Sequence, residues 1–435
     1  AVPINLAKWV SDQLIATGFH RLHLIIDRGT ALPEESFTKN VIDRLTSVGT
    51  GFMGLTVQCA QCHDHKYDPI TQKDFYSLYA FLNNIDAQPE TVANPKYGLQ
   101  QPFVSFATEA QTVQLAEFNR KIKKLDADIA KSKQAIAEEV KELEKKRAKQ
   151  KLLDEERLKA NQNSDGDKKT RLLSREPDAG KLANLEVQAK ALSDSRKKLI
   201  RQRDAVDAQV YRAMVMKERK EVRPTNILER GQYDMPGELV ERNTPEFMFP
   251  IKKSGEVPTR MDLANWLVAK ENPLTARVAV NRFWQQLFGV GLVKTSEDFG
   301  AQGEVPSHPE LLDWLTVEFV ESGWDVKSIM KTMVMSKTYR RSSVASPDQF
   351  AADPENRMLA RGARYRMDAE MIRDQILATS GLLNQELYGK SVKPPQPAGL
   401  WKAVTMTGQV FRPDAGNAIY RRSLYTIWKR AIPPP

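Results

Sequence analysis

The sequence predicts a mainly α-helical protein in which two helical domains are joined by a long antiparallel coiled-coil hairpin. Three observations support this fold class. Apolar residues recur at three- and four-residue spacing through most of the chain, no segment shows a strong strand pattern, and the middle of the chain carries a heptad pattern with one interruption. We expect helical domains at residues 1–108 and 223–435, the second truncated at its C-terminus, and the hairpin at 109–222.

The first domain is expected to hold two helices on either side of a cysteine motif. Ser36 is a candidate N-cap, and Thr71 with Asp74 resembles a capping box for the second helix. The apolar positions of the two helices are Val41, Leu45, Val48, Phe52 and Leu55, then Phe75, Leu78, Tyr79 and Leu82. Glycines at 49, 51 and 54 weaken the first helix and let a bulky group approach its backbone.

The hairpin is predicted from two apolar seams. The first seam is Leu115, Phe118, Ile122, Leu125, Ile129 and Ile136; the second is Leu182, Leu185, Ala189, Leu192, Leu199, Val206 and Val210, with Arg196 and Arg203 in its gaps. A polar tract at 161–169, Pro177 and Gly180 separate the two seams. The pattern leaves open whether the arm pairs with itself or with another subunit.

The apolar spacing in the last domain predicts five further helices. They are expected at 260–270, 272–289, 307–323, 325–343 and 366–383. Asn272 or Thr275 and Ser307 are candidate caps. Four tryptophans are expected as core anchors: Trp266, Trp284, Trp314 and Trp324.

Composition limits the classes of partner. A net charge of +10 and a pI near 9.3 suit an acidic partner such as a polysaccharide, although a solvated surface rich in lysine is the favoured explanation. No RNA-binding signature, zinc-finger spacing or helix-turn-helix pattern is present, so we expect no nucleic acid partner. No stretch approaches the roughly 18 apolar residues of a membrane span. Both ends of the sequence look cut, and the oligomeric state is left open.

The only two cysteines lie in "CAQCH", where Cys59, Cys62 and His63 form Cys-x-x-Cys-His. On a helix these positions share one face. A c-type haem needs this arrangement, because two thiols add to two vinyl groups on one porphyrin edge and the next imidazole binds the iron. The motif therefore predicts haem c, with His63 as the metal ligand.

Three other interpretations compete with haem. A thioredoxin-like motif needs a preceding strand, and a helix is expected here. A tetrahedral zinc site, or one for non-haem iron, needs four ligands, and the two cysteines with His63 or His65 could combine with His20 or His23. The two cysteines could also be reduced and simply buried.

A sixth haem ligand would have to come from elsewhere in the fold. His65 follows His63 too closely to reach the opposite side of the ring. His20 and His23 are better placed, and Met53 is a third candidate, although a methionine among apolar residues is usually part of a core.

Several long segments resemble a known family. They are "GLTVQCAQCHDHKYDPITQKDFYSLYAFLNN", the run from Asn272 to Ser343, "DPENRMLARGARYRMDAEMIRDQILATSGLL" and "YRRSLYTIWKR". Together they are similar to the planctomycete cytochrome-c-associated family of exported proteins with paired domains of unknown function. The resemblance covers most of residues 1–108 and 223–435.

The resemblance implies an internal fragment of a longer protein with an export signal, and a location in the periplasm or cell envelope, where haem is attached. Only Cys59, Cys62 and His63 match the family's haem-attachment motif. Similar proteins are suspected of a part in polysaccharide breakdown, but no reaction is settled for them.

Three hypotheses follow. The first is an exported haem-c redox or electron-transfer module that serves a redox partner protein. The second is a hydrolase or lyase acting on acidic polysaccharide, with candidates Glu297, Asp298, Glu304, Glu310 and Asp313 beside Arg282, Arg340 and Arg341, because carboxylate pairs can do acid–base work on glycosidic bonds. The third is a non-catalytic scaffold stabilised by zinc or iron. Whether the chain is an enzyme stays undecided at this point.

Overall fold

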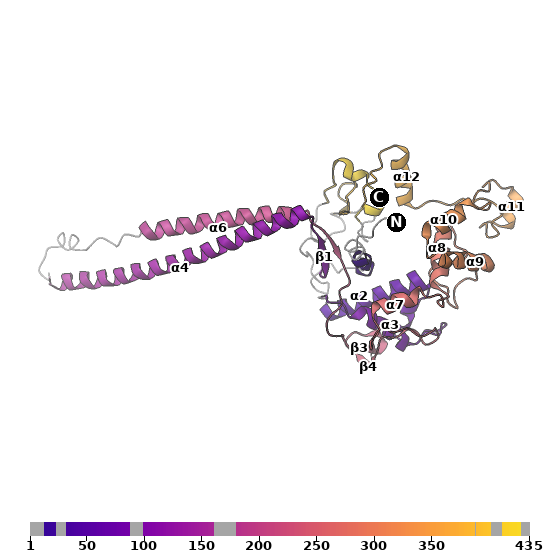
Figure 1. Cartoon of the computed structure of the whole chain (residues 1–435), viewed down its shortest axis with the longest axis horizontal. Helices are drawn as coiled ribbons and strands as arrows, with labels where there is room; N and C mark the ends of the chain where they lie inside the picture. The colour runs from indigo at the N-terminus through magenta and orange to yellow at the C-terminus, as the bar shows by residue number, and fades with distance from the viewer. Residues whose placement is uncertain are drawn as a thin grey trace. The chain divides into compact units, whose positions relative to one another are not determined.

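The computed structural model is mainly helical, as predicted (Figure 1). It describes residues 13–22, 32–87, 99–160, 180–387, 389–401 and 411–427. The chain forms two compact units, one of Ala1–Phe103 with Ala213–Pro435 and one of Val104–Arg212. The finer division into domains at 1–108, 109–222 and 223–435 stays a prediction.

The first long helix, α2, spans Pro33–Val48. Pro33 lies in its first turn, where the missing N–H costs nothing, and the carboxylates of Glu34 and Glu35 favour the positive end of the helix dipole. Ser36 is buried inside this turn and its N–H donates to the Leu32 carbonyl at 2.9 Å. The prediction of Ser36 as the N-cap is therefore wrong.

Helix α2 also ends earlier than the apolar spacing indicates. A π-helical turn, Gly49–Met53, follows it, and Gly54 ends that turn with a φ of 61°. A Cβ atom at Gly49 would lie 2.4 Å from the Val57 side chain. The chain can therefore turn back on itself here because glycine leaves room for the next segment.

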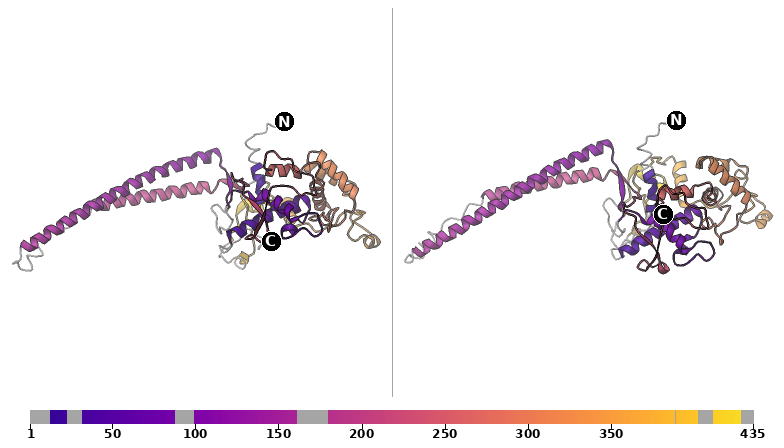
Figure 2. Two further views of the ribbon diagram at one scale, coloured as in Figure 1. Left: turned by 90° about the horizontal axis from the view of Figure 1, so that it is seen from below. Right: turned by 60° about the horizontal axis from the view of Figure 1, so that its bottom comes forward.

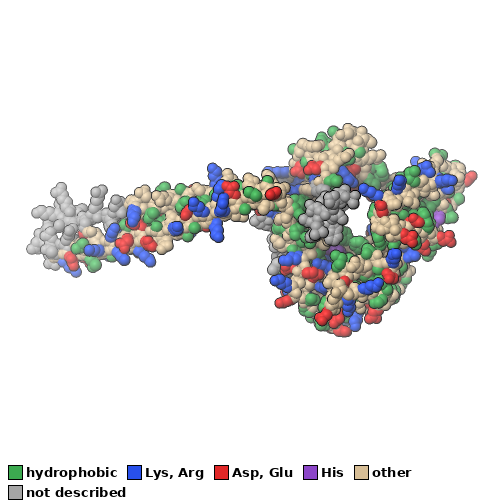
Figure 3. All heavy atoms as spheres, in the orientation of Figure 1, with side chains coloured by type: hydrophobic (Ala, Val, Ile, Leu, Met, Phe, Trp, Pro, Cys, Tyr) green, Lys and Arg blue, Asp and Glu red, His purple; other side chains and the backbone are tan. Residues whose placement is uncertain are grey.

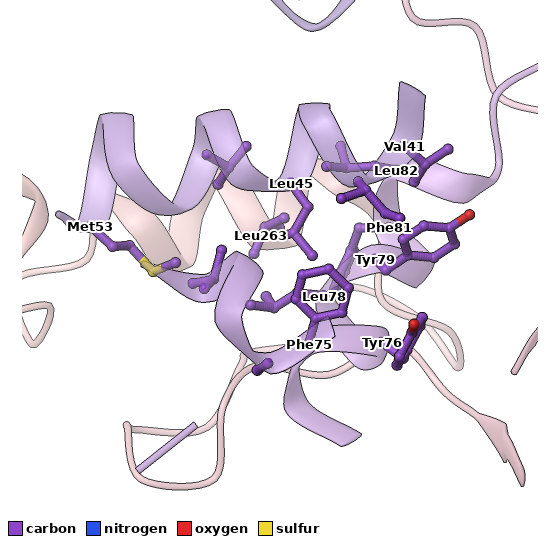
Figure 4. Close-up of a cluster of buried hydrophobic side chains, with 14 of the residues drawn as sticks. Val41, Leu45, Met53, Phe75, Tyr76, Leu78, Tyr79, Phe81, Leu82 and Leu263 are labelled. Atoms are coloured by element: carbon purple, nitrogen blue, oxygen red, sulfur yellow. The ribbon is translucent and has the colours of Figure 1, made fainter. Parts of the chain in front are cut away.

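The second helix, α3, spans Gln72–Asn83 and begins with the predicted capping box. The Thr71 hydroxyl accepts a hydrogen bond from the Asp74 N–H at 3.0 Å, and the Asp74 carboxylate accepts one from the Thr71 N–H at 2.9 Å. Figure 4 shows the core that α2 and α3 share. Its members include Val41, Leu45, Met53, Phe75, Leu78, Phe81, Leu82 and Leu263.

The predicted antiparallel hairpin is present. Helices α4, Glu109–Ala160, and α6, Gly180–Asp207, lie side by side in all three views (Figures 1 and 2). Ion pairs set the register, with Lys181 at 2.5 Å from Glu139 and Arg196 at 2.5 Å from Asp126. The predicted seam positions on both helices are buried or half-buried. The hairpin thus closes on itself within one chain, while the interruption predicted at 161–179 lies outside the described residues.

Most of the chain's net charge belongs to this hairpin. Residues 104–212 contain 26 Lys and Arg and 19 Asp and Glu, so 26 − 19 gives +7 of the net +10. On the face that Figure 3 draws, blue and red side chains are intermixed along the hairpin. This distribution is typical of a solvated coiled coil.

Four short strands were not predicted. Strands β1, Phe103–Phe106, and β2, Tyr211–Met214, form one two-stranded sheet. Strands β3, Thr225–Leu228, and β4, Pro236–Val240, form an antiparallel hairpin with an irregularity between Asn226 and Leu228. Each strand has only four or five residues, which is too short for a clear alternating pattern.

The five helices expected after residue 258 are all present, and a short sixth was missed. They are α7 Arg260–Leu267, α8 Thr275–Phe288, α9 Pro309–Glu321, α10 Val326–Met335 and α12 Ala369–Thr379, with the missed α11 at Pro347–Ala352. The N-cap residue of α8 is Leu274, so neither predicted cap, Asn272 or Thr275, holds that position, although the Asn272 side chain accepts from the Leu274 and Thr275 N–H groups. Ser307 does not cap α9, whose N-cap residue is His308.

The tryptophans divide between core and surface. Trp266 and Trp284 are buried as expected and Trp324 is half-buried, but Trp314 is 50% exposed. Helix α9 turns Leu312, Leu315 and Phe319 inward instead, so Trp314 falls on its outer face. The prediction of Trp314 as a core anchor is wrong.

Among the helices that the structure describes, none has both the length and the apolar character needed to cross a bilayer.

A buried amide links α8 to the loop that follows it. Asn281 is fully buried; its side chain accepts from the Val293 N–H at 2.8 Å and donates to the Val293 carbonyl at 2.9 Å.

We expect Asn281→Leu to lower the free energy of unfolding by about 2–4 kcal/mol, because it leaves both backbone groups buried and unpaired. Urea denaturation measures this. Gln286→Leu, an exposed position on the same helix, should change it by less than about 0.5 kcal/mol; equal losses in the two variants would contradict the assignment.

Candidate functional site

The cysteine motif lies on a single 3₁₀ turn, Val57–Gln61, rather than on the end of an α-helix. Since a 3₁₀ helix has three residues per turn, Cys59 and Cys62 are spaced to lie on the same side of it. Both are free thiols and both are exposed. Val57 and Ala60 are 1% and 0% exposed on the other side. The turn is thus anchored in the core by one side and presents its two sulfur atoms to solvent on the other.

The neighbouring imidazole is exposed and has one nitrogen open. His63 Nδ1 lies 2.6 Å from the carbonyl oxygen of Asp64. This contact assigns the proton to Nδ1, which donates it to the carbonyl, and leaves the Nε2 lone pair free. Ligating histidines usually donate their second ring N–H in this way. Two exposed thiols and this imidazole together fit the donor set of a c-type haem.

His65, in contrast, is a structural residue. It is buried, and its Nδ1 accepts from the N–H groups of Tyr67 at 3.2 Å and Asp68 at 2.8 Å. Its Nε2 therefore carries the proton and lies 3.1 Å from the Thr56 hydroxyl. Both nitrogens are used, so His65 shapes the loop after the motif and has none left for a metal. No sequence pattern indicates this role, because two of the three partners are backbone groups.

Asp68 continues this loop toward a distant part of the chain. Its carboxylate accepts from the Ala301 N–H at 2.7 Å. A Cβ atom at Gly300 would lie 2.4 Å from that carboxylate. The segment after the cysteine motif is therefore held against the 298–301 loop by a contact that only glycine permits.

Two of the expected second ligands, His20 and Met53, lie in the described part of the chain, and no contact of either with the cysteine motif is recorded there. His20 lies in the short helix η1, Thr17–Arg21, where its ring meets Phe19 edge-on and its carbonyl accepts a hydrogen bond from Arg44 Nε at 2.8 Å. His23 lies outside the described residues. Met53 is 1% exposed and points into the core of Figure 4.

A zinc site of the predicted kind is not assembled by the residues that the structure describes. In that part of the chain, no three His, Cys, Asp or Glu side chains are grouped so that they could hold a metal ion. His65 is already occupied by its hydrogen bonds. A tetrahedral site at Cys59 and Cys62 would still lack its remaining ligands.

Three residues that sequence reasoning missed hold the motif in place. The Tyr76 hydroxyl and the Gln72 amide both donate to the Gln61 carbonyl at 3.0 Å. Gln72 also donates to the Leu228 carbonyl at 3.3 Å. Burial, with smaller contributions from Tyr79 and Cys62, raises the pKa of Tyr76, so its phenol stays protonated and can donate. Leu228 is 156 residues from Gln72, and no local pattern could have predicted that contact.

A separate cavity of about 690 Å³ collects some of the other candidates. Arg282, Glu297 and Asp298 line it, as do Lys294, Arg366 and Asp368. Thr56, just before the cysteine turn, also contributes to the wall. The remaining candidates Glu304, Glu310, Asp313, Arg340 and Arg341 are not part of this lining, and Asp313 pairs with Arg277 at 2.8 Å.

His20 makes the folded state sensitive to acid. Burial, and then the charges of Arg260 and Arg44, lower its pKa to about 4, compared with about 6.5 in an unfolded chain. Between these values only the unfolded state binds the proton, so stability falls as the pH decreases from about 6.5 toward 4. We expect the loss between pH 7.5 and pH 5 to be about 2 kcal/mol smaller in His20→Gln. Urea denaturation at the two pH values checks this; an unchanged difference would argue against the burial of a neutral imidazole.

Two family models match the chain. Residues 3–87 match PSCyt2, a protein of unknown function (DUF1549), and residues 259–435 match PSD1, a protein of unknown function (DUF1553). Together they cover more than half of the chain. No curated protein and no solved structure matches it. With the cysteine turn inside the first match and the 690 Å³ cavity lined mainly by the second, the chain belongs to the planctomycete cytochrome-associated family in which these two domains of unknown function are paired.

Proposed function

We propose that the chain is an exported haem-c-binding module for redox chemistry or electron transfer. Cys59 and Cys62 would anchor the porphyrin through thioether bonds, and His63 would bind the iron. The observation that carries this proposal is the exposure of both free thiols on one 3₁₀ turn, next to an exposed imidazole whose Nε2 is open.

The chain's own residues support this role in three ways. Val57 and Ala60 anchor the turn in the core, so Cys59 and Cys62 can remain exposed. The Asp64 carbonyl orients the His63 ring. Both thiols are exposed. A haem on this turn would therefore sit near the protein surface, where it supplies one-electron chemistry to a partner protein.

The proposal includes a location and a domain arrangement. Because haem c is attached outside the cytoplasm, we place the protein in the periplasm or cell envelope. Residues 1–108 would act as the cytochrome-associated domain, the hairpin at 109–222 as an arm, and residues 223–435 as a second helical domain. His63 is the chain's proposed ligand to the iron, and no described residue is proposed as a second one.

Production with the haem-c maturation machinery tests the proposal. We expect about one covalently bound haem per chain in a pyridine haemochrome assay, one thioether in Cys59→Ser or Cys62→Ser, and none in the double variant. His63→Ala should keep the covalent link but change the visible spectrum, whereas His308→Ala should resemble the wild type. Absence of a Soret band, or stoichiometric zinc without porphyrin, would rule haem out.

A second candidate function is supported by the 690 Å³ cavity. Arg282, Glu297 and Asp298 were candidates for an enzyme acting on acidic polysaccharide, and all three line it. Glu297 is exposed and Asp298 also accepts the Gly300 N–H at 2.9 Å. Two carboxylates beside arginine could provide acid–base catalysis on a glycosidic bond.

Incubation with a panel of charged polysaccharides tests this candidate. If it holds, Glu297→Gln should lower product formation at least about 100-fold, the usual contribution of a general acid or base. Asp313→Asn, at a carboxylate outside the cavity, is the matched control and should keep full activity. Product from none of the polysaccharides, or equal activity in both variants, would remove the candidate.

A further inference from the structure

The turn between β3 and β4 lies against the cysteine motif. This turn is Glu229–Gly231, in which Arg230 has a φ of 51° and Gly231 a φ of 72°. Both values lie in the left-handed region that residues other than glycine seldom adopt. Such a conformation persists where the surrounding structure requires it.

Within this turn, Gly231 lies closest to the side chains of Gln61 and Cys62. A Cβ atom built at Gly231 would lie 2.9 Å from Cys62 Sγ and 2.8 Å from Gln61 Nε2. Both distances are well inside van der Waals contact. The positive φ strains any other residue here, and an added Cβ atom would also displace the sulfur atom in front of it.

Hydrogen bonds hold the two turns together. Gln72 Nε2 bridges the carbonyls of Gln61 and Leu228, at 3.0 and 3.3 Å. Gln61 Nε2 in turn donates to the Gly231 carbonyl at 3.4 Å. The contact between Gly231 and Cys62 therefore belongs to a connected set of bonds and is not an isolated approach of two loops. No comparable contact is described for Cys59 Sγ.

We propose that Gly231 is a positioning residue for Cys62: the Glu229–Gly231 turn covers one side of the Cys62 sulfur and fixes its direction, leaving Cys59 as the more accessible thiol. Strands β3 and β4 fall in neither family match, so the comparisons do not assign this segment to the site. The consequence for haem rests on the proposed function, but the positioning of the thiol does not.

The position of Cys62 matters for haem because two thioethers must form on one porphyrin edge. In each addition the sulfur bonds to one vinyl carbon and the thiol hydrogen passes to the other, so no oxidant or reductant is needed. A sulfur free to rotate would satisfy this geometry only part of the time. Gly231 would raise the fraction of chains in which both links form.

The test compares Gly231→Ala with two matched glycine variants in haem-free, reduced protein. Gly237→Ala lies in the same hairpin, where a Cβ atom would meet only the Ile227 carbonyl at 3.3 Å and Glu229 Cγ at 3.8 Å. Gly323→Ala has nearly the same φ, 73°, with nothing within 4 Å. The first control accounts for a change in the hairpin and the second for backbone strain alone.

The rate of alkylation by iodoacetamide is measured at each cysteine by peptide mass. In the wild type we expect Cys62 to react more slowly than Cys59. Gly231→Ala should raise the Cys62 rate several-fold and leave Cys59 unchanged, and both controls should keep the wild-type ratio. An unchanged Cys62 rate in Gly231→Ala, or an equal change in either control, would overturn the proposal.

If Gly231→Ala fails to fold, the melting temperature of the double variant Gly231→Ala with Cys62→Ala still tests the contact between Gly231 and the sulfur. Removal of the sulfur should restore part of the lost melting temperature; no recovery would show that the sulfur contact is not the constraint. With the maturation machinery, Gly231→Ala should carry more haem with a single thioether than the wild type does. If the wild type binds no haem, the proposed function fails, while the alkylation ratio still tests the positioning of Cys62.

Discussion

The site depends on one constraint, the burial of Val57 and Ala60 beneath a turn of only five residues. Each removes an apolar side chain from water, and the spacing of three that buries them also turns Cys59 and Cys62 outward. The capped start of α3 and the Tyr76 hydroxyl then hold the end of the turn. The chemistry that the motif offers therefore follows from where its apolar neighbours pack.

The two family-matched segments are joined by specific contacts within one compact unit. The Phe299 N–H donates to the Gly54 carbonyl at 2.7 Å, Ala301 to the Asp68 carboxylate, and Arg282 to the Thr50 carbonyl at 3.0 Å. In each of these contacts, the residue from the first segment lies within twenty residues of the cysteine turn. The cavity takes Thr56 from the first segment and the rest of its lining from the second. These contacts give a physical reason for the pairing of the two domains, since neither segment completes this region alone.

Sequence reasoning succeeded where the determining interactions are local. Amphipathic spacing located α7, α8, α9, α10 and α12, the seam of the hairpin, and the Thr71 capping box, because each depends on residues a few positions apart. It failed where distant segments decide. The bend after Val48 requires contact with Val57, and the support of Gln61 comes from Leu228 and Gly231. The cysteine motif itself was evident, but its 3₁₀ geometry and the structural role of His65 were not, since both depend on backbone hydrogen bonds that leave no residue pattern.

Net charge, finally, is a poor guide to the ligand of the cavity. The hairpin at 104–212 accounts for +7 of the net +10, so the other unit is close to neutral. The cavity lining balances three cations with three carboxylates: Arg282, Lys294, Arg366, Glu297, Asp298 and Asp368. Lys294 is also paired with Glu355 at 3.1 Å, which leaves two arginines against three carboxylates. The overall charge of the chain therefore supplies no argument for an acidic ligand in this cavity, and the second candidate function rests on its carboxylates beside Arg282 alone.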